Sequence, residues 1–349
     1  MTNQISLPKD DLEHILNKTR GLFKDAYKKK FFMTGGTGFF GLWLLESFVW
    51  INEKLNLNAS VVVLSRKPEI FKEKYPYFKK IKSVKFLKGD IRSFRFPKGQ
   101  HHYIIHAATD NNLSSSPLDL FRNNITGTQR VLDFARACHN EAFLFTSSGA
   151  VYGEQPFKML RIPEDYRGAP VTININSAYG ESKRVSEFYC VNYAREFGIN
   201  VKIARCFAFL GPNLPLNINF AAGNFVRDAL NGEPICVKSN KRVYRSYLYS
   251  ADLVIWLWTI LFRGKTNKPY NVGSSEPCSI VELADLVAEV FSPKVKVEIK
   301  NKTKNKTKNN LKHIERYVPD TNLAKKELGL RQFISLKDGI CKMVNYYRP

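Results

Sequence analysis

A tyrosine and a lysine lie four positions apart in the segment SAYGESKRVSEF, at Tyr179 and Lys183. On a helix this spacing puts both side chains on one face, with Cβ atoms about 5 to 6 Å apart. A nearby ammonium group favours the phenolate form of tyrosine, so Tyr179 could exchange a proton with a substrate hydroxyl group as a general acid or base. Such pairs are common on ordinary helix surfaces, so the context decides their meaning.

The segment SSGAVYG, residues 147–153, follows the apolar run 142–145 and carries hydroxyl groups but no carboxylate. A strand with such an end delivers its polar side chains to the carboxyl edge of a parallel sheet, where α/β proteins bind their ligands. Hydroxyl groups at this edge can form hydrogen bonds, but they cannot replace a carboxylate in proton transfer.

A glycine-rich turn, TGGTGFFG at 34–41, follows a short apolar strand and opens a helical segment. It fits both GxGxxG and the offset GxxGxxG. Glycines permit a tight turn and a close approach of the backbone to a pyrophosphate, and the helix N-terminus offers unpaired N–H groups. We therefore predict a dinucleotide site that includes Gly35, Gly36, Thr37, Gly38, Phe39, Phe40 and Gly41.

The second expected strand ends in Ser65 and Arg66, where an acidic residue would hold the ribose 2′-hydroxyl of NAD. An arginine there pairs with the 2′-phosphate of NADP, so Arg66 favours NADP(H). NAD(H) stays open, because an arginine can also stack on adenine. Asp90 and Ile91 follow the third strand; Asp90 is placed to accept from the adenine amino group, or is only a turn residue.

Apolar runs and helical segments alternate along the first 206 residues. The runs are continuously apolar, which is typical of a parallel sheet covered on both faces. After about residue 206, loops rich in Pro, Asn and Gly mix with shorter elements. We predict an α/β protein with a Rossmann-type doubly wound parallel sheet and a smaller C-terminal α/β substrate lobe. Strands are expected at 30–34, 60–66, 84–90, 102–108, 142–148 and 201–207, and helices at 8–29, 40–54, 118–138 and 179–197.

The composition of the 349 residues limits the classes of function. The net charge is +23, but much of the excess lies in lysine runs such as 28–30 and 300–310, which are typical of solvated surface and loop. The chain has no apolar stretch of about 18 residues and no apolar signal segment. Its six cysteines lack metal-site spacing. We expect a cytoplasmic protein with reduced thiols, no metal, no nucleic-acid partner and no membrane insertion.

These motifs, in this order, resemble the extended short-chain dehydrogenases/reductases that act on nucleotide sugars. The similarity covers residues 31–349. Further similar segments are HAAT at 106–109, NITGT at 124–128, ARCFAFLGP at 204–212, NFVRDALNGEP at 224–234, RSYLYSADL at 245–253 and ERYVPDTNLAKKELG at 315–329. The resemblance implies an N-terminal helical extension at 1–30, an NAD(P)-binding domain at 31–205, and a nucleotide-sugar-binding lobe at 206–349 with some segments returning to the sheet.

The same resemblance implies roles for individual residues. Ser148 would hydrogen-bond the reacting hydroxyl or carbonyl group, Tyr179 would exchange its proton, Lys183 would hold the nicotinamide ribose and lower the pKa of Tyr179, and Asn124 would support the site. Ala107, Ala108 and Thr109 would contact the cofactor; Asn224, Arg245 and Arg316 would bind the substrate, a nucleotide-diphosphate sugar. A homodimer through the helices 118–138 and 179–197 is also implied.

Four departures or substitutions bear on the reaction. Dehydratases of this group carry Asp followed by Glu at the two positions where this chain has Gly149 and Ala150. Decarboxylases of the group carry Glu at the second of these positions, where this chain has Ala150. Ala208 replaces a frequent substrate-contacting asparagine, and SNKR at 239–242 replaces a glycine-rich turn. The pattern favours a 4-ketoreductase of a nucleotide-linked 6-deoxy-4-ketohexose. The alternatives are a 4-epimerase with tightly bound NAD, a dehydratase or decarboxylase with relocated acid/base groups, and a non-catalytic NADP-binding protein.

Overall fold

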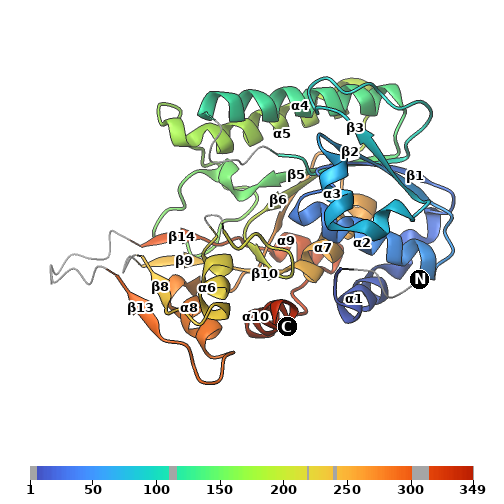
Figure 1. Ribbon diagram of the computed structural model, residues 1–349. Coiled ribbons are helices and arrows are strands. Elements are labelled where there is room, and N and C mark those ends of the chain that lie inside the picture. The colour runs from blue at the N-terminus through green and yellow to red at the C-terminus, as the bar shows by residue number, and fades with distance from the viewer. Residues whose placement is uncertain (1–5, 110–115, 218–219, 239–241, 301–313, 349) are drawn as a thin grey trace.

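A seven-stranded parallel β-sheet forms the centre of the molecule (Figure 1). The computed structural model describes residues 6–109, 116–217, 220–238, 242–300 and 314–348. Every pairing within this sheet is parallel. In spatial order the strands are β11 (Pro269–Val272), β6 (Val201–Cys206), β5 (Ala142–Ser148), β4 (Tyr103–His106), β1 (Lys30–Thr34), β2 (Ser60–Ser65) and β3 (Val84–Lys88).

The central strands are apolar on both faces because helices cover both faces of the sheet. All seven residues of β5 are buried, and so are four of the five residues of β1. The six strands expected from the sequence are present, and β11 from the C-terminal half joins them beside β6. The prediction of a doubly wound parallel sheet is therefore confirmed.

The order of the strands reverses between β1 and β4. The chain runs from β1 through β2 to β3 at one edge, and β4, β5, β6 and β11 then extend the sheet from the other side of β1. Loops that leave β1 and β4 diverge at such a reversal, and ligands of α/β proteins bind there, beyond the carboxyl ends of the strands. Because β1, β4 and β5 are parallel, the glycine turn after β1 and Ser148 at the end of β5 lie at the same edge.

Two pairs of helices enclose the sheet (Figure 1). The first pair, α4 (Pro117–Ala137) and α5 (Ala178–Phe197), packs on one face around Phe134 and Cys190. The second pair, α2 (Phe39–Lys54) and α7 (Ser250–Arg263), packs on the other face around Trp43 and Trp258. The short α3 (Pro68–Lys74) connects β2 to β3.

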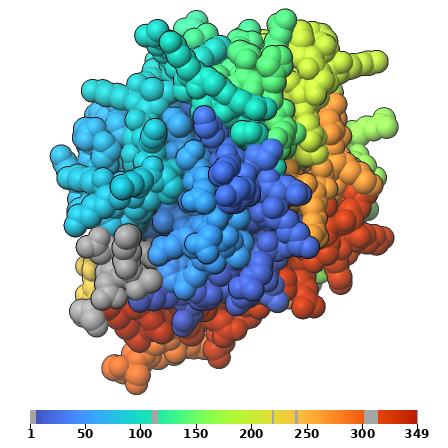
Figure 2. Space-filling view, turned by 90° about the vertical axis from the view of Figure 1, so that its right-hand side faces the viewer, coloured from blue at the N-terminus to red at the C-terminus, as the bar shows by residue number. Residues whose placement is uncertain are grey.

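The N-terminal segment forms a shorter α-helix than expected. Helix α1 spans Lys9–Thr19, and the chain continues as a 3₁₀ helix over Arg20–Asp25, which contains Gly21. The buried carboxylate of Asp11 anchors α1, because it accepts hydrogen bonds from Tyr249 Oη (2.6 Å) and Lys342 Nζ (2.8 Å). Figure 2 accordingly shows N-terminal residues in blue beside C-terminal residues in red.

The residues after β6 form smaller elements beside the main sheet. Three short strands pair as β12-β9-β14, two as β13-β8 and two as β10-β7. Residues 301–310 of the lysine-rich segment and 239–241 of SNKR lie outside the described residues. The elements are β7 (Phe209–Leu210), α6 (Ala221–Leu230), β8 (Ile235–Val237), β9 (Val243–Arg245), β10 (Leu248–Tyr249), β12 (Cys278–Ser279), α8 (Ile280–Ala288), β13 (Val297–Ile299), β14 (Glu315–Tyr317), α9 (Asn322–Leu328) and α10 (Leu336–Tyr347).

Within the described residues, no helix combines the length and the apolar character that a membrane crossing requires.

Candidate active site

Ser148 ends strand β5 and lies at the centre of the candidate site. The chain then turns through a 3₁₀ helix, Gly149–Tyr152, and the Ala150 N–H donates to Ser148 Oγ at 3.1 Å. Ser148 is buried among the ends of the neighbouring strands. Its hydroxyl group therefore has a fixed position at the carboxyl edge of the sheet.

Tyr179 and Lys183 lie in the first turns of α5, as their spacing predicted. Lys183 is 3% exposed, and its Nζ donates to the Thr146 carbonyl oxygen at 2.9 Å. The ammonium group also lies 4.9 Å from the centre of the Phe145 ring. Because burial disfavours a charge, the pKa of Lys183 falls to about 8.

The pKa of Tyr179 differs from the expectation that Lys183 lowers it. Burial raises this pKa, and hydrogen bonds with Ser148 and Thr109 only partly oppose the effect. Lys183 Nζ lies 5.9 Å from the centre of the Tyr179 ring and is directed to Thr146 instead. In this structure Tyr179 is therefore a protonated phenol that touches Ser148.

Asn124 connects three parts of the site. Its Nδ2 donates to Ser182 Oγ at 3.0 Å, and its Oδ1 accepts from Thr109 Oγ1 at 3.2 Å. Ser182 Oγ in turn donates to the carbonyl oxygen of Tyr179 at 2.8 Å. Asn124 thus joins the start of α5 to α4 and the end of β4.

His106 is a buried polar residue behind the site that the sequence did not single out. Its Nδ1 lies 2.8 Å from Thr34 Oγ1 and its Nε2 lies 3.0 Å from Thr128 Oγ1. Burial, followed by the charge of Lys183, lowers the pKa of His106 to about 3. The imidazole is therefore neutral near pH 7 and joins β1, β4 and α4.

Tyr317 and Phe207 also enter the site, and sequence reasoning missed both. Tyr317 Oη lies 3.5 Å from Ser148 Oγ, and the rings of Tyr317 and Phe207 lie 4.6 Å apart between centres. A Cβ atom on Gly149 would lie 2.7 Å from both Tyr317 Oη and the Phe207 ring. The space beside Gly149 is therefore filled by aromatic side chains. No spacing signal in the sequence joins residues so far apart.

The glycine turn has the shape that a pyrophosphate group requires. Gly35 has a positive φ of 72°, and a Cβ there would lie 2.5 Å from Ala107 backbone. A Cβ on Gly41 would lie 2.1 Å from Gly35 O. Gly38 is different, because it is exposed and a Cβ there would meet only Gly35 O at 3.4 Å. The backbone at Gly38, directly before α2, thus stays open to a ligand.

The residues predicted at the adenosine end lie beyond β2 and β3. Thr37 Oγ1 lies 3.4 Å from Ser65 Oγ. Arg66 is exposed after β2, and Asp90 accepts from Arg92 through both carboxylate oxygens, at 2.8 and 2.9 Å. These hydrogen bonds from Arg92 lower the pKa of Asp90. Asp90, the acceptor predicted for the adenine amino group, is therefore already hydrogen-bonded to the guanidinium group of Arg92.

Further predicted cofactor residues line the β4 and α4 side of the turn. Ala108 N–H donates to Thr34 Oγ1 at 3.2 Å, which joins the ends of β1 and β4. A Cβ on Gly127 would lie 2.9 Å from Ile91, so Ile91 packs against α4. The glycine turn, the end of β4 and the residues after β3 thus form one continuous edge, which fits an extended dinucleotide.

The predicted substrate residues do not all lie together. Arg245 and Arg316 belong to the neighbouring strands β9 and β14, and Arg245 lies 5.8 Å from the centre of the Tyr317 ring. Arg245 also pairs with Glu315. Arg316 lies over Tyr244 at 4.7 Å, and its buried Nε has no partner among the described residues. Both guanidinium groups could hold phosphate oxygens.

Asn224 lies in the first turn of α6, where its Oδ1 accepts from Arg227 Nη1 at 3.4 Å. This position is on the lobe that carries Arg245. The helix packs against β8 and α8, among the smaller elements beside the main sheet.

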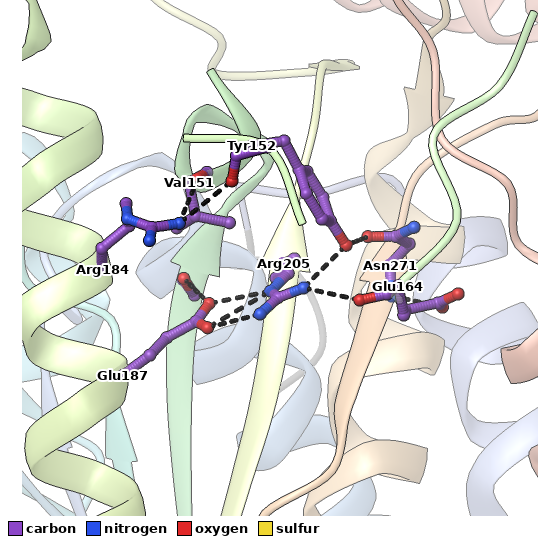
Figure 3. Close-up of polar contacts among 9 residues, drawn as sticks. Val151, Tyr152, Glu164, Arg184, Glu187, Arg205 and Asn271 are labelled. Atoms are coloured by element: carbon purple, nitrogen blue, oxygen red, sulfur yellow. Dashed lines mark hydrogen bonds and ion pairs between the residues drawn. The ribbon is translucent and has the colours of Figure 1, made fainter. Parts of the chain in front are cut away.

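Two carboxylates near β5 are held by other groups (Figure 3). Glu187 accepts from Ser147 Oγ at 2.5 Å and from Arg205 Nη2 at 2.7 Å. Arg205 Nη1 also donates to Tyr152 Oη at 2.9 Å. Glu164 Oε1 accepts from the N–H of Asn271 at 2.9 Å. These carboxylates therefore belong to a structural network beside the site.

The described part of the chain holds no group of three or more His, Cys, Asp or Glu side chains that could bind a metal ion. The chemistry of the site as described rests on hydroxyl, phenol and ammonium groups.

Comparison with known protein families gives one match over most of the chain. The sequence model of the NAD dependent epimerase/dehydratase family matches residues 31–273. UDP-glucuronic acid decarboxylase 5 of Arabidopsis thaliana is 29% identical over 233 residues, which make up 67% of this chain and 65% of that relative. The chain thus spans slightly less than two thirds of that relative. UDP-glucuronic acid decarboxylase 6 of the same plant is 27% identical over 319 residues, 90% of this chain and 88% of the relative.

Solved structures share the fold. A UDP-N-acetylglucosamine 4-epimerase from Methanobrevibacter ruminantium, in complex with UDP-N-acetylmuramic acid, has a TM-score of 0.77 at 19% identity and covers 92% of this chain and 98% of its own. A dTDP-glucose 4,6-dehydratase from Bacillus anthracis, in complex with NAD, has a TM-score of 0.73 at 18% identity, with coverages of 91% and 96%.

Proposed function

Since the chain belongs to the NAD-dependent epimerase/dehydratase family, we propose that it interconverts two nucleotide sugars that differ in configuration at C4. The observation that carries this proposal is the composition of the site. Ser148, Tyr179 and Tyr317 bring three hydroxyl groups together beside Lys183. Oxidation and reduction of a hydroxyl group need a proton carrier and a hydrogen-bond donor of this kind.

Different side chains carry out the proton transfer and the hydrogen bonding at one sugar carbon, C4. Tyr179, once it has lost its own proton, takes the proton of the 4-hydroxyl group as a phenolate, and Ser148 donates a hydrogen bond to the same oxygen. NAD, for which the glycine turn at Gly35, Gly38 and Gly41 would form the binding site, would supply the hydride chemistry at C4. Tyr179 then gives its proton back to the oxygen. Lys183, with a pKa of about 8, is mostly charged near pH 7, and its ammonium group is the nearby cation that would partly offset the burial of a Tyr179 phenolate.

Elimination and decarboxylation fit the site less well. Gly149 has no room for a side chain, and the nearby Glu187 is held by Ser147 and Arg205. Glu187 and Glu164, the carboxylates near β5, are both engaged by other groups, so a different side chain would have to act as the additional acid or base. The curated relatives compared above are named for decarboxylation, so formation of a pentose from UDP-glucuronic acid belongs among the tested reactions.

A 4-ketoreductase, the reaction that the sequence favoured, is the second candidate. Arg66 supports it, because this exposed guanidinium group after β2 could pair with the 2′-phosphate of NADP. The family is described as NAD-dependent, and the relatives and structures compared above are named for other reactions. NAD is therefore the proposed cofactor. A non-catalytic binding protein would not need Ser148, Tyr179 and Lys183 together.

The proposal extends to the assembly and the compartment. Phe188 and Val191 on α5 are 69% and 37% exposed, which supports a homodimer through α4 and α5. Light scattering should give a dimer, and Phe188→Asp should give a monomer, while Phe157→Asp at another exposed site should not.

All six cysteines are free thiols in the structure, which supports the cytoplasm as the compartment.

The test begins with the purified protein without added cofactor. Mass spectrometry of the released nucleotides should find NAD, and incubation with single UDP-hexoses should give the C4 epimer with no net formation of reduced nicotinamide. Tyr179→Phe should abolish interconversion and keep the bound nucleotide. Stoichiometric consumption of NADPH with 4-keto-6-deoxy sugars, without interconversion, would instead establish the reductase. Release of carbon dioxide from UDP-glucuronic acid would establish the decarboxylase.

A further inference from the structure

Tyr317 reaches the site from a strand of the C-terminal lobe. Strand β14 pairs in parallel with β9, which places Tyr317 beside Arg245. The next residue, Val318, donates its N–H to Gln155 Oε1 at 2.9 Å and accepts from the Ile162 N–H at 2.9 Å. The end of β14 is thereby tied to the loop that follows Ser148. The pairing with β9 and the hydrogen bonds of Val318 together fix the position of Tyr317.

The ring of Tyr317 has little freedom to move. It packs against Phe207 at 4.6 Å between ring centres, and the hydroxyl group faces the backbone of Gly149. Tyr317 Oη and Ser148 Oγ are 3.5 Å apart. Hydrogen bonds in catalytic sites are often long before the substrate binds and tighten in the complex. The distance therefore suits a bond that completes the site.

The number of hydrogen bonds that Ser148 can donate and accept indicates the direction of its hydrogen bond with Tyr317. A serine hydroxyl group has one proton to donate and two lone pairs that accept. The Ala150 N–H occupies one lone pair at 3.1 Å, and the Tyr317 hydroxyl group faces Ser148 from another side. When the Tyr317 hydroxyl group donates to the second lone pair, the proton of Ser148 can only be donated away from Ala150 and Tyr317, toward Tyr179 or a substrate oxygen.

We propose that Tyr317 is a positioning residue that donates its phenol proton to Ser148 Oγ and thereby makes Ser148 a hydrogen-bond donor to the reacting sugar oxygen. The identity of that oxygen rests on the proposed function. Burial raises the pKa of Tyr317, which keeps its phenol protonated and able to donate. Ser148 would then support the carbonyl oxygen of the oxidised sugar, which can only accept.

A double-mutant cycle tests this role in turnover. Tyr317→Phe keeps the ring against Phe207 and removes only the hydroxyl group. In the enzyme with Ser148 we expect kcat to fall about tenfold, the scale of one hydrogen bond, with KM changed less than about twofold. In the Ser148→Ala background Tyr317→Phe should change nothing further. Equal losses in both backgrounds would overturn the proposal. Tyr270→Phe, which removes another phenol group, bonded to Glu327, controls for stability.

A second measurement needs no substrate. Tyrosine labelled with carbon-13 at the phenol carbon reports the ionisation of Tyr179, with its signal assigned by Tyr179→Phe. Without Tyr317, the vacated lone pair of Ser148 can accept from the Tyr179 hydroxyl group, which stabilises the neutral phenol. We therefore expect Tyr317→Phe to raise the pH at which Tyr179 titrates, and to have no effect in the Ser148→Ala background.

The two measurements separate the proposals. If no sugar is interconverted but the titration shifts only when Ser148 is present, the proposed function fails and the role of Tyr317 stands. If sugars are interconverted and Tyr317→Phe leaves the pH at which Tyr179 titrates unchanged, the proposed function stands and the role of Tyr317 is overturned. A shift of equal size with and without Ser148 also overturns it.

Discussion

The ammonium group of Lys183 donates a hydrogen bond to the carbonyl oxygen of Thr146 across 2.9 Å, in a position that is only 3% exposed. Burial lowers the pKa of Lys183 from 10.5 to about 8. Below pH 8 the folded protein must hold a charge that would be better solvated in the unfolded chain. This cost to the free energy of folding is relieved as the pH rises from about 8 to 10.5, because the folded state loses its proton first.

Lys183→Met should therefore stabilise the fold near neutral pH while it removes activity. The difference in the free energy of unfolding should be largest at pH 7, up to about 3 kcal/mol less the lost bond to Thr146, and should shrink toward pH 10. Denaturant unfolding of cofactor-free protein at several pH values measures it. Lys325→Met, at an exposed position on α9, is the control. A difference that stays constant with pH would contradict the prediction.

The glycine turn allows a separation of cofactor binding from folding. A Cβ on Gly38 would meet only Gly35 O at 3.4 Å, whereas a Cβ on Gly41 would lie 2.1 Å from the same oxygen. Gly38→Ala should thus keep the stability of the cofactor-free protein within about 1 kcal/mol, but lose most of the bound dinucleotide. Gly41→Ala should lose both the dinucleotide and about 1 to 3 kcal/mol of stability.

Nucleotide content by mass spectrometry and denaturant unfolding of the same preparations check this pair of variants. Gly38→Ala protein that copurifies with as much dinucleotide as the unchanged protein would show that the ligand does not approach this glycine.

The sheet and the positions of Ser148, Tyr179 and Lys183 could be predicted because their signals are local. Each strand is a continuous apolar run, and Tyr179 and Lys183 share one helix face by their spacing. Tyr317 could not be found this way, since its contact with Ser148 spans 169 positions and depends on how β14 joins β9. The raised pKa of Tyr179 was missed for a related reason. It depends on burial by residues from several elements, which outweighs the neighbouring ammonium group.

Gly149 is predicted to be intolerant of even a methyl group. Its Cβ would lie 2.7 Å from Phe207 and from Tyr317 Oη, so Gly149→Ala must displace the aromatic pair. We expect a loss of about 1 to 3 kcal/mol of stability and of most activity, measured by thermal unfolding and turnover. Gly21→Ala, where no atom lies within 4 Å, should be neutral. Adding Phe207→Leu to Gly149→Ala should recover part of the lost stability. If stability is not recovered, the loss does not come from a clash with Phe207.

The pair of Glu187 and Arg205 supports the strands that carry Ser148 (Figure 3). Their side chains are only 12% and 14% exposed, and the ions meet at 2.7 Å. Removing one charge from such a pair leaves the other unpaired in a poorly solvated position. Glu187→Gln should therefore cost about 3 kcal/mol of stability in denaturant unfolding. Glu181→Gln is the matched control, because Glu181 lies 3.8 Å from Arg184, whose side chain is 42% exposed, and such pairs contribute little.

The double variant Glu187→Gln with Arg205→Met should be more stable than Glu187→Gln alone, because the unpaired guanidinium group is gone and a side chain of similar length fills its place. If the two losses simply add, the pair does not act as a unit, and the support of β5 comes from Tyr152 and Asn271 instead. The hydrogen bonds described above join Glu187 and Arg205 to each other, to Ser147 and to Tyr152. The charge of Glu187 raises the pKa of Lys183, so turnover should follow stability in these variants well below pH 8, where Lys183 stays charged. A fall in kcat at full stability would instead assign Glu187 to the chemistry, through its bond from Ser147, the residue before Ser148.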